Sequence, residues 1–576
     1  MVPPFCALLL VVAVVFAPAW RVQASDSWPQ IKITTQNTGL HHVTAAGLAA
    51  LIGVSSNDVR DRILQGKWQL LNRGQPGRWL AGSNGLDLIF YAGALRNNYT
   101  TNNVYWLVDG TNTAPAVVNG GSPAAVSGTC YLAATNCEQD IYCRYELGTH
   151  PDSNYWYWAN VVAGHPLRGK FDVTVPLDAL GYTSALAQIT VRVCGGSATN
   201  QYVGLTVNGT TNAAWVGAWQ GAVPAVFTFN FPASLLNVGN NTIRFTALGA
   251  SGTQWWLDGF VLEFPRPYTS VAGALQCGAN SNAVVTMTGF GNRFITVVDV
   301  SQPLSPVVVT NLLVETNGGQ WRASFAPASG VARYSEAQSG SLLTPLALEA
   351  VTPLNLASPT NRAACIIIAP AALQSSATNL ASYRNAQGLE TRVIPLEAIY
   401  NEFNGGLREP EALRTFLAQA HSNWQLPPAY VVLAGNGTYD YRNLLGMNDN
   451  LVPPLMITCL YGLAASDSEF GDLGGTNAPE IAVGRLPATN AVQLTAMINK
   501  IKAYEALPSP AAKQALLVAD FADPGAGDFP TQILDVQEMV APAFQATTVL
   551  PSTVVQMHNQ VLAGLNAGAD LMCYMG

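Results

Sequence analysis

The sequence between Tyr430 and Pro487 constrains the fold of this chain more than any other stretch. It opens with the apolar run YVVLA at 430–434, which ends at Gly435-Asn436-Gly437. A short run rich in β-branched residues that stops at glycines is typical of a buried strand opening into a loop. Open α/β sheets place their functional sites in such loops. We therefore predict a parallel-sheet strand at 430–434 and a functional loop, TYDYRN, at 438–443.

Strand and helix signals alternate throughout the sequence after Pro359. Apolar runs predict strands at 365–369, 390–394, 430–434, 480–483, 515–519, 546–550 and 569–575. Helical spacing and stop signals predict helices at 373–387, 409–422, 488–505, 531–541 and 557–567. Strands that alternate with helices form a mostly parallel sheet with helices on both faces. The predicted fold class of residues 359–576 is therefore α/β.

Residues 25–358 instead show short β runs divided by turns. We predict a β module at 25–160, a regular β-sandwich at 161–267, and a third β module with a proline-punctuated linker at 268–358. Asn208-Gly209 favours a hairpin turn, because both residues tolerate positive φ. The end of the sandwich sequence resembles a galactose-binding-like jelly roll. If Trp215, Trp219 and Trp255 are exposed, they offer stacking faces for glycans; tryptophans in sandwiches are more often core residues.

Three motifs resemble gingipain-type cysteine peptidases. VVLAGNGTYDYRN at 431–443, followed by PEIAVGRLP at 479–487, is similar to the paired motifs of their catalytic domains. YTTNNVYWL at 99–107 is similar to a segment of the prodomain-like β modules that precede those domains. The resemblance implies a caspase-like α/β domain at 359–576 and a cysteine endopeptidase acting on proteins or peptides, whose chemistry requires no cofactor.

The residues of a peptidase dyad are expected outside this sequence. A cysteine peptidase needs a thiolate, an imidazole that carries the proton, and donors for the oxyanion. In the family that the chain resembles, the histidine follows a Y-x-G turn, and the sequence stops at Tyr574-Met575-Gly576. We therefore expect a fragment that is inactive by itself. Cys573 lies in an apolar strand before this turn, and His421 and His558 fall in helical sequence, so none of the three is a candidate for the dyad.

Three aspartates are candidates for roles around such a dyad. Asp520 ends the predicted strand 515–519, where the resemblance places an acid that orients the histidine. Asp523 is the alternative if the loop is shifted. Asp528 falls where a basic-residue-specific member of the family has its substrate-pocket acid, although a solvated loop acid is the more ordinary interpretation.

A second acidic cluster suggests a structural metal. Asp467, Glu469 and Asp472 supply hard oxygen ligands, and the resemblance implies structural calcium. The adjacent His41 and His42 lack a matching acid or cysteine spacing, so we predict no metal site at these histidines.

The N-terminal residues predict export. An apolar run at 6–17 precedes Val22-Gln23-Ala24, which is the cleavage pattern of a secretory signal peptide at 1–24. The run is shorter than the roughly 20 apolar residues of a membrane span. No later segment predicts a transmembrane helix, so a secreted or cell-surface protein is expected. Cys130, Cys137 and Cys143 lie close together in the sequence, and a disulfide among them fits an exported protein.

Charge and motifs exclude several function classes and leave two alternatives open. The net charge of −8 gives no basic face for nucleic acid. No Walker A, HExxH or GxSxG pattern occurs, which removes phosphate-loop, zinc-peptidase and α/β-hydrolase chemistry. The alternatives to an endopeptidase are a sortase-like transpeptidase of a secretion system and a non-catalytic carbohydrate-binding surface protein.

Overall fold

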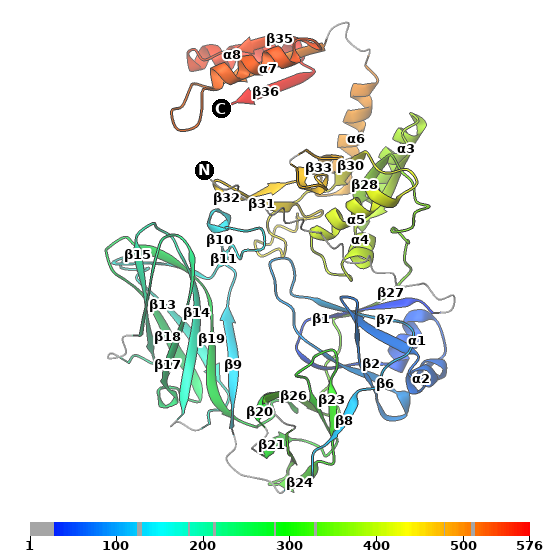
Figure 1. Cartoon of the computed structure of the whole chain (residues 1–576), viewed down its shortest axis with the longest axis vertical. Helices are drawn as coiled ribbons and strands as arrows, with labels where there is room; N and C mark the ends of the chain where they lie inside the picture. The colour runs from blue at the N-terminus through cyan, green and yellow to red at the C-terminus, as the bar shows by residue number, and fades with distance from the viewer. Residues whose placement is uncertain are drawn as a thin grey trace, which may run out of the picture. The chain divides into compact units, whose positions relative to one another are not determined.

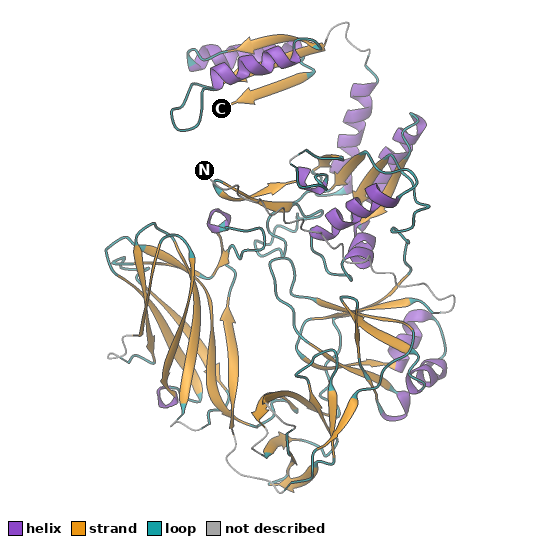
Figure 2. Ribbon diagram, viewed as in Figure 1, coloured by secondary structure: helices purple, strands orange, loops and turns teal. Residues whose placement is uncertain are grey.

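The structure is a computed structural model that describes residues 28–123, 130–181, 185–210, 215–280, 284–327, 331–476, 478–507 and 513–576. The chain forms two compact units, Met1–Thr495 and Ala496–Gly576. Figures 1 and 2 show β-strands prevailing in the first part of the sequence and helices alternating with strands in the last. The predicted signal peptide at 1–24 lies outside the described residues. Within the described ranges, no helix has the length and apolar character needed to cross a bilayer.

The first module packs two antiparallel sheets with two helices. The sheet orders are β27-β1-β7-β3-β4 and β2-β6-β5. Thr44 and Ser55 accept hydrogen bonds from backbone N–H groups of the first helical turns, which fixes where the two helices begin. The elements are β1 (Gln30–Thr35), β2 (Gly39–Thr44), α1 (Ala45–Ile52), α2 (Ser56–Leu64), β3 (Trp68–Asn72), β4 (Gln75–Gly77), β5 (Leu80–Ala81), β6 (Asp87–Ala92), β7 (Asn103–Asp109) and β27 (Ala347–Val351). Edge strand β27 thus joins this sheet from far along the chain, antiparallel to β1.

The β-sandwich consists of two antiparallel sheets over one apolar core. One has the order β12-β19-β14-β17, with β9 also paired to β19, and the other β13-β18-β15-β16. Asn208 and Gly209 both have positive φ, 50° and 74°, and this confirms the predicted turn. The strands are β9 (Cys130–Glu138), β12 (Ala159–Val162), β13 (Lys170–Leu177), β14 (Leu186–Gly195), β15 (Asn200–Val207), β16 (Trp215–Gln220), β17 (Pro224–Pro232), β18 (Gly239–Leu248) and β19 (Gln254–Pro267). A separate two-stranded ribbon joins β10 (Tyr142–Cys143) to β11 (Trp156–Tyr157).

The tryptophans of the sandwich pack on its core, which is the more ordinary of the two interpretations of the sequence. Trp255 is only 1% exposed, and Trp215 and Trp219 are partly buried against the same core. Trp219 lies edge-on to Trp255, with ring centroids 6.4 Å apart. Trp255 offers no exposed face on which a sugar could stack, and the rings of Trp215 and Trp219 pack partly on the core, so glycan binding by this sandwich stays a prediction.

A third β module follows the sandwich. Its sheets have the orders β20-β26-β22-β23-β8 and β21-β25-β24, and β8 is parallel to β23. The strands are β8 (Ala116–Asn119), β20 (Ala274–Asn280), β21 (Val285–Phe290), β22 (Ile295–Asp299), β23 (Val307–Thr310), β24 (Leu313–Asn317), β25 (Gln320–Phe325) and β26 (Val331–Gln338). Residues 268–338 therefore form β structure, as predicted, with one strand added from the first module's sequence.

The rest of the first unit is α/β, as predicted. Its four-stranded sheet has the order β29-β28-β30-β33, and every pairing is parallel. The elements are β28 (Cys365–Ala369), α3 (Gln374–Ala386), β29 (Thr391–Pro395), α4 (Leu396–Phe403), α5 (Glu411–Asn423), β30 (Tyr430–Ala434), the hairpin β31 (Leu455–Cys459) with β32 (Gly462–Ser466), and β33 (Ala482–Leu486). Strands β28 and β30 have the predicted limits, whereas α4 and the hairpin were not predicted.

The second unit contains a three-stranded parallel sheet with helices. The strand order is β35-β34-β36. The elements of the last part of the chain are α6 (Ala491–Glu505), β34 (Lys513–Ala519), α7 (Phe529–Val540), β35 (Phe544–Val549), α8 (Val554–Ala567) and β36 (Leu571–Met575). Each lies within a few residues of its predicted range, and the parallel pairing confirms the α/β fold class of this part of the sequence.

Candidate functional site

The loop after β30 is held against the strand ends by backbone hydrogen bonds. Gly435 N–H donates to the Leu486 carbonyl at 3.0 Å, and the N–H groups of Leu451 and Val452 both donate to Asn436 O at 2.9 Å. A Cβ at Gly437 would lie 2.5 Å from the Val452 carbonyl oxygen, so only glycine fits there. The glycines that signalled the end of the strand thus let the two ends of this loop approach each other.

Arg485 joins the two motifs that carry the family resemblance. Its guanidinium donates from Nε and Nη2 to the Asp467 carboxylate at 2.7 and 2.6 Å. Its Nη1 donates to the carbonyl oxygens of Gly435 and Val452 at 2.8 and 2.7 Å. A planar fork that satisfies a carboxylate and two carbonyls is specific to arginine. Arg485 therefore anchors both ends of the loop after β30 to β33.

Asp440 shapes the centre of the same loop. Its side chain is nearly buried, and its two carboxylate oxygens accept the N–H groups of Leu444 and Leu445 at 2.7 Å each. These bonds close the turn that carries Tyr441 and Arg442. Asp440 is therefore a structural acid, with both oxygens occupied by the backbone.

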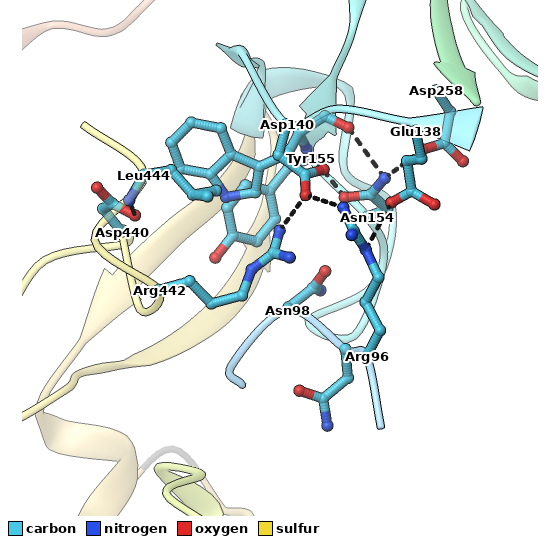
Figure 3. A network of polar contacts seen from close by, with 12 residues as sticks. Arg96, Asn98, Glu138, Asp140, Asn154, Tyr155, Asp258, Asp440, Arg442 and Leu444 are labelled. Carbon is cyan, nitrogen blue, oxygen red and sulfur yellow. Dashed lines mark hydrogen bonds and ion pairs between the residues drawn. The ribbon is translucent and has the colours of Figure 1, made fainter. Parts of the chain in front are cut away.

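A network of ion pairs fixes the loop to the β modules of the first unit (Figure 3). Arg442 and Arg96 both donate to the Asp140 carboxylate, at 2.7 and 2.6 Å. The chain of pairs continues from Arg96 to Glu138 at 3.2 Å, then through Arg192 to Asp258. Tyr155 adds a bond from its hydroxyl to the Tyr439 carbonyl at 2.8 Å. Because Asp258 is buried, its pKa is raised despite the nearby Arg192 guanidinium.

Asp520 lies where two parallel strands of the second unit end. Its N–H donates to Met575 O at 2.7 Å, so the carboxyl ends of β34 and β36 lie side by side. The Tyr574 hydroxyl donates to the Asp520 carboxylate at 3.1 Å, and this bond raises the Tyr574 pKa. The other carboxylate oxygen accepts the Phe521 N–H at 2.7 Å. The carboxyl edge of this sheet is the position at which α/β folds place site residues.

Comparison with known families identifies the α/β part of the chain. Residues 358–576 match the model of peptidase family C25. This segment belongs to peptidase family C25. It includes both parallel sheets, the loop after β30 and Asp520. The resemblance inferred from the motifs is therefore confirmed, and we refer to residues 358–576 as the C25 domain.

The fold is similar to that of dimeric latent PorU from Porphyromonas gingivalis. The identity is 17% and the TM-score 0.59, over 83% of this chain and 50% of that chain. At this identity the similarity shows the fold, caspase-like C25 domain included, and the chain spans half the length of that PorU chain. None of the curated proteins compared with the chain matches it.

Carbohydrate-binding modules are among the other structures found. A module of a xylanase from the hindgut metagenome of Trinervitermes trinervoides has 17% identity and TM-score 0.15, over 23% of this chain and 96% of that chain. A family 35 module from Clostridium thermocellum has 20% identity and TM-score 0.14, over 24% and 98%. Similarity at this level supports no functional conclusion.

The other two candidate aspartates of the C25 domain have local structural roles. Asp528 caps the N-terminus of α7, accepting the Thr531 N–H at 3.3 Å and its hydroxyl at 2.7 Å. The Asp523 carboxylate accepts the Gly525 N–H at 2.7 Å within a tight turn. Neither contact tests a role in substrate binding or catalysis, and the predicted role of Asp528 in a substrate pocket stays a prediction.

The acids proposed for calcium have other contacts. The Asp467 carboxylate is taken by Arg485, and Asp472, 3% exposed, accepts the Thr476 N–H at 2.9 Å. Glu469 is half-buried. In the described ranges, no three His, Cys, Asp or Glu side chains are grouped so as to hold a metal ion. This geometry offers calcium no preformed ligand set, and a thermal-shift titration with Ca²⁺, repeated on Glu469→Gln, tests the prediction.

The described residues bring no histidine to a cysteine. Cys573 lies on β36 and packs against the apolar cluster around Leu517, as expected for a core strand. His558 is exposed on α8, and His421 lies on α5. No hydrogen bond joins a histidine ring to a cysteine sulfur in the part of the chain that the structure describes.

The disulfide expected among Cys130, Cys137 and Cys143 is not formed. All eight described cysteines are free thiols. Cys130 and Cys137 stand at opposite ends of β9, and seven residues of extended strand separate them by about 23 Å. Cys143 belongs to the ribbon strand β10, paired with Trp156. The ring of His41 contacts the Gly39 carbonyl, and the ring of His42 contacts the Asp87 carboxylate.

Sequence reasoning missed the residues that fix the loop. Arg442 and Arg485 are part of the motifs that carry the resemblance, yet neither was assigned a role. Arg485 directly follows Gly484, and Arg442 lies two residues after Asp440 in the polar loop, and these positions within the motifs were the signal available for them. Asp140 gave no signal, because its partner Arg442 is 302 positions away.

Proposed function

We propose that this chain belongs to a secreted gingipain-like cysteine endopeptidase. The observation that carries the proposal is the C25 match over 358–576, together with Asp520 at the adjoining ends of β34 and β36. The substrates are proteins or peptides. In the reaction, a cysteine thiolate attacks the scissile carbonyl and a histidine carries the proton to the leaving amine.

Asp520 is the residue of this chain that we assign to the catalytic arrangement. Its carboxylate would accept the N–H of the histidine ring, hold the tautomer that takes the thiol proton, and stabilise the imidazolium. The histidine and the cysteine themselves are expected outside residues 1–576. We infer that the polypeptide 1–576 by itself hydrolyses no peptide bond.

A cleavage assay on the full-length protein tests this function. A peptide library is incubated with the wild type, Asp520→Asn and the matched control Asp523→Asn. We expect Asp520→Asn to lower kcat by roughly 10²-fold or more, with the control near wild type. Equal kcat values for all three proteins would show that Asp520 has no role in catalysis. If the folded wild-type protein cleaves no peptide of the library, the proposed peptidase activity is wrong.

The same assay separates hydrolysis from acyl transfer. An added amine, such as a glycine peptide, competes with water for the acyl-enzyme. A transpeptidase gives mainly the product extended by the amine, whereas an endopeptidase gives the free carboxylate. Mass spectrometry of the products decides between the two activities.

Export is the second part of the proposal. It rests on the signal-peptide pattern at 1–24 and on the low share of charged residues, 11%. N-terminal sequencing of the protein recovered outside the producing cells should give Ser25 as the first residue. Retention of Met1 or intracellular accumulation would contradict export.

A further inference from the structure

A cavity lies at the carboxyl ends of three parallel strands in the first unit. Its volume is about 620 Å³. One wall consists of Pro370 and Ala371 after β28, of α4 after β29, and of loop residues 441–453 after β30. The opposite wall comes from the first β module, through Gln36, residues 99–102 and Glu349. Open α/β sheets bind ligands at this edge, and the size lies in the range of small-molecule sites.

The walls of this cavity are fixed by contacts between the first β module and the C25 domain. Trp106 donates from its indole N–H to the Gly405 carbonyl at 2.8 Å, in a buried position. Asn97 donates to the Glu409 carboxylate at 2.7 Å. The rings of Tyr99 and Tyr441 meet edge-on, with centroids 4.8 Å apart. The cavity is therefore preformed, and a ligand would not have to order its walls.

The arginines around the cavity are already paired with acids of the protein. Glu397 accepts Lys32 at 2.8 Å and pairs with Arg408 at 3.2 Å. Arg442 is held by Asp140, outside the cavity. The other lining acid, Glu349, is exposed to solvent. An anionic ligand would thus find no unpaired arginine to neutralise it, and this arrangement disfavours an anion.

Tyr400 and Asn102 supply polar groups at the cavity. The Tyr400 side chain is only 3% exposed, and the charges of Glu397 and Arg408, which also line the cavity, act on its hydroxyl. Burial raises the Tyr400 pKa, so the group stays a neutral donor and acceptor. The side-chain oxygen of Asn102 is buried without a hydrogen-bond partner among the described residues, and a buried polar group requires one.

We propose that this cavity binds a small uncharged polyhydroxylated molecule of the monosaccharide class, with the Tyr400 hydroxyl as its buried hydrogen-bond partner. Sugar hydroxyls donate and accept at once, as the phenol of Tyr400 does. The amides of Gln36 and Asn450 supply further polar partners, and the Tyr99 and Tyr441 rings supply apolar surface. Asp520 is not among the residues that line this cavity, and the proposal does not depend on the proposed peptidase activity.

Ligand-observed NMR on the chain 1–576 tests this site. The probes are glucose, galactose and N-acetylglucosamine, with glucuronate and glucosamine as charged counterparts. We expect saturable binding of at least one neutral sugar, weaker binding of its charged counterpart, and about five- to tenfold weaker binding to Tyr400→Phe. Tyr430→Phe, at the exposed start of β30, is the matched control and should bind as the wild type does.

A second variant covers the case in which Tyr400→Phe disturbs the core. Ala371→Phe places a ring in the cavity from an exposed position and should abolish binding while the fold is kept. Failure of every neutral sugar to saturate the protein would overturn the proposal, since water alone would then solvate Tyr400. Binding that survives both Tyr400→Phe and Ala371→Phe would place the sugar elsewhere, and tighter binding of glucuronate would refute an uncharged ligand.

Discussion

Arg442 donates to Asp140 across 2.7 Å, and their side chains are only 8% and 2% exposed. The pair joins the loop after β30 of the C25 domain to a segment that follows β9 of the sandwich. Arg96 brings a second guanidinium to the same carboxylate at 2.6 Å. Buried charges are stable only when they are paired and hydrogen-bonded. The stability of this contact therefore depends on Arg442, Arg96 and Asp140 together.

Replacing Arg442 with methionine should loosen the loop without unfolding the domain. The substitution leaves Asp140 buried with one cation and costs about 3 kcal/mol, which raises amide hydrogen exchange in residues 438–452 by about 100-fold. Hydrogen exchange resolved by mass spectrometry measures this. Arg322→Met, which breaks a half-exposed pair with Glu315, is the control and should leave these residues unchanged. Unchanged exchange in Arg442→Met would show that the network contributes nothing to the loop.

Arg485→Lys should damage the same loop from its other side. Lysine cannot bridge the Asp467 carboxylate and the carbonyls of Gly435 and Val452 together, so two acceptors lose their donors. We expect protease cleavage within 436–452 to be faster by at least about tenfold. The control variant Arg362→Lys changes an equally bidentate but solvent-exposed pair with Glu390. The protease should cleave this variant at the wild-type rate. Equal rates for both variants would refute the anchoring role.

Glu336 should make the third β module less stable as pH rises. It is 1% exposed, its carboxylate accepts the Cys277 thiol at 3.3 Å, and burial raises its pKa to about 8 from 4.5. The folded state keeps a proton that the unfolded chain releases, so stability falls between about pH 4.5 and pH 8. Glu336→Gln should remove this fall, on the order of a few kcal/mol. Parallel melting-temperature profiles against pH for both proteins would contradict the assignment.

Trp255→Ala should destabilise the sandwich. Removal of a fully buried indole costs about 3–5 kcal/mol, which a thermal melt of the chain would show as an earlier first transition. Trp28→Ala, which removes a partly buried indole packed on the core of the first module, is the control for effects outside the sandwich. A variant that melts as the wild type does would mean that Trp255 does not support the core.

The sequence predicted the α/β part more closely than the contacts between modules. Strand β30 is signalled by its own apolar run and terminal glycines, and Asp520 by the strand that precedes it, so local pattern was sufficient. That Trp215 and Trp219 face the same side could also be read from the sequence, because they lie four residues apart in a strand of alternating faces, and the structure packs both partly on the core. Long-range pairs such as Arg442 with Asp140, and β27 with β1, leave no local sequence pattern, because the two partners come together only in the folded chain.

Active-site labelling tests the central claim most directly. A peptidyl acyloxymethyl ketone alkylates the thiolate of a cysteine peptidase that has a working histidine, and peptide mapping then locates the modified residue. The account predicts a labelled cysteine outside residues 1–576 in the full-length protein and no labelling of the polypeptide 1–576. Labelling of Cys573, or of any other cysteine in residues 1–576, would contradict it.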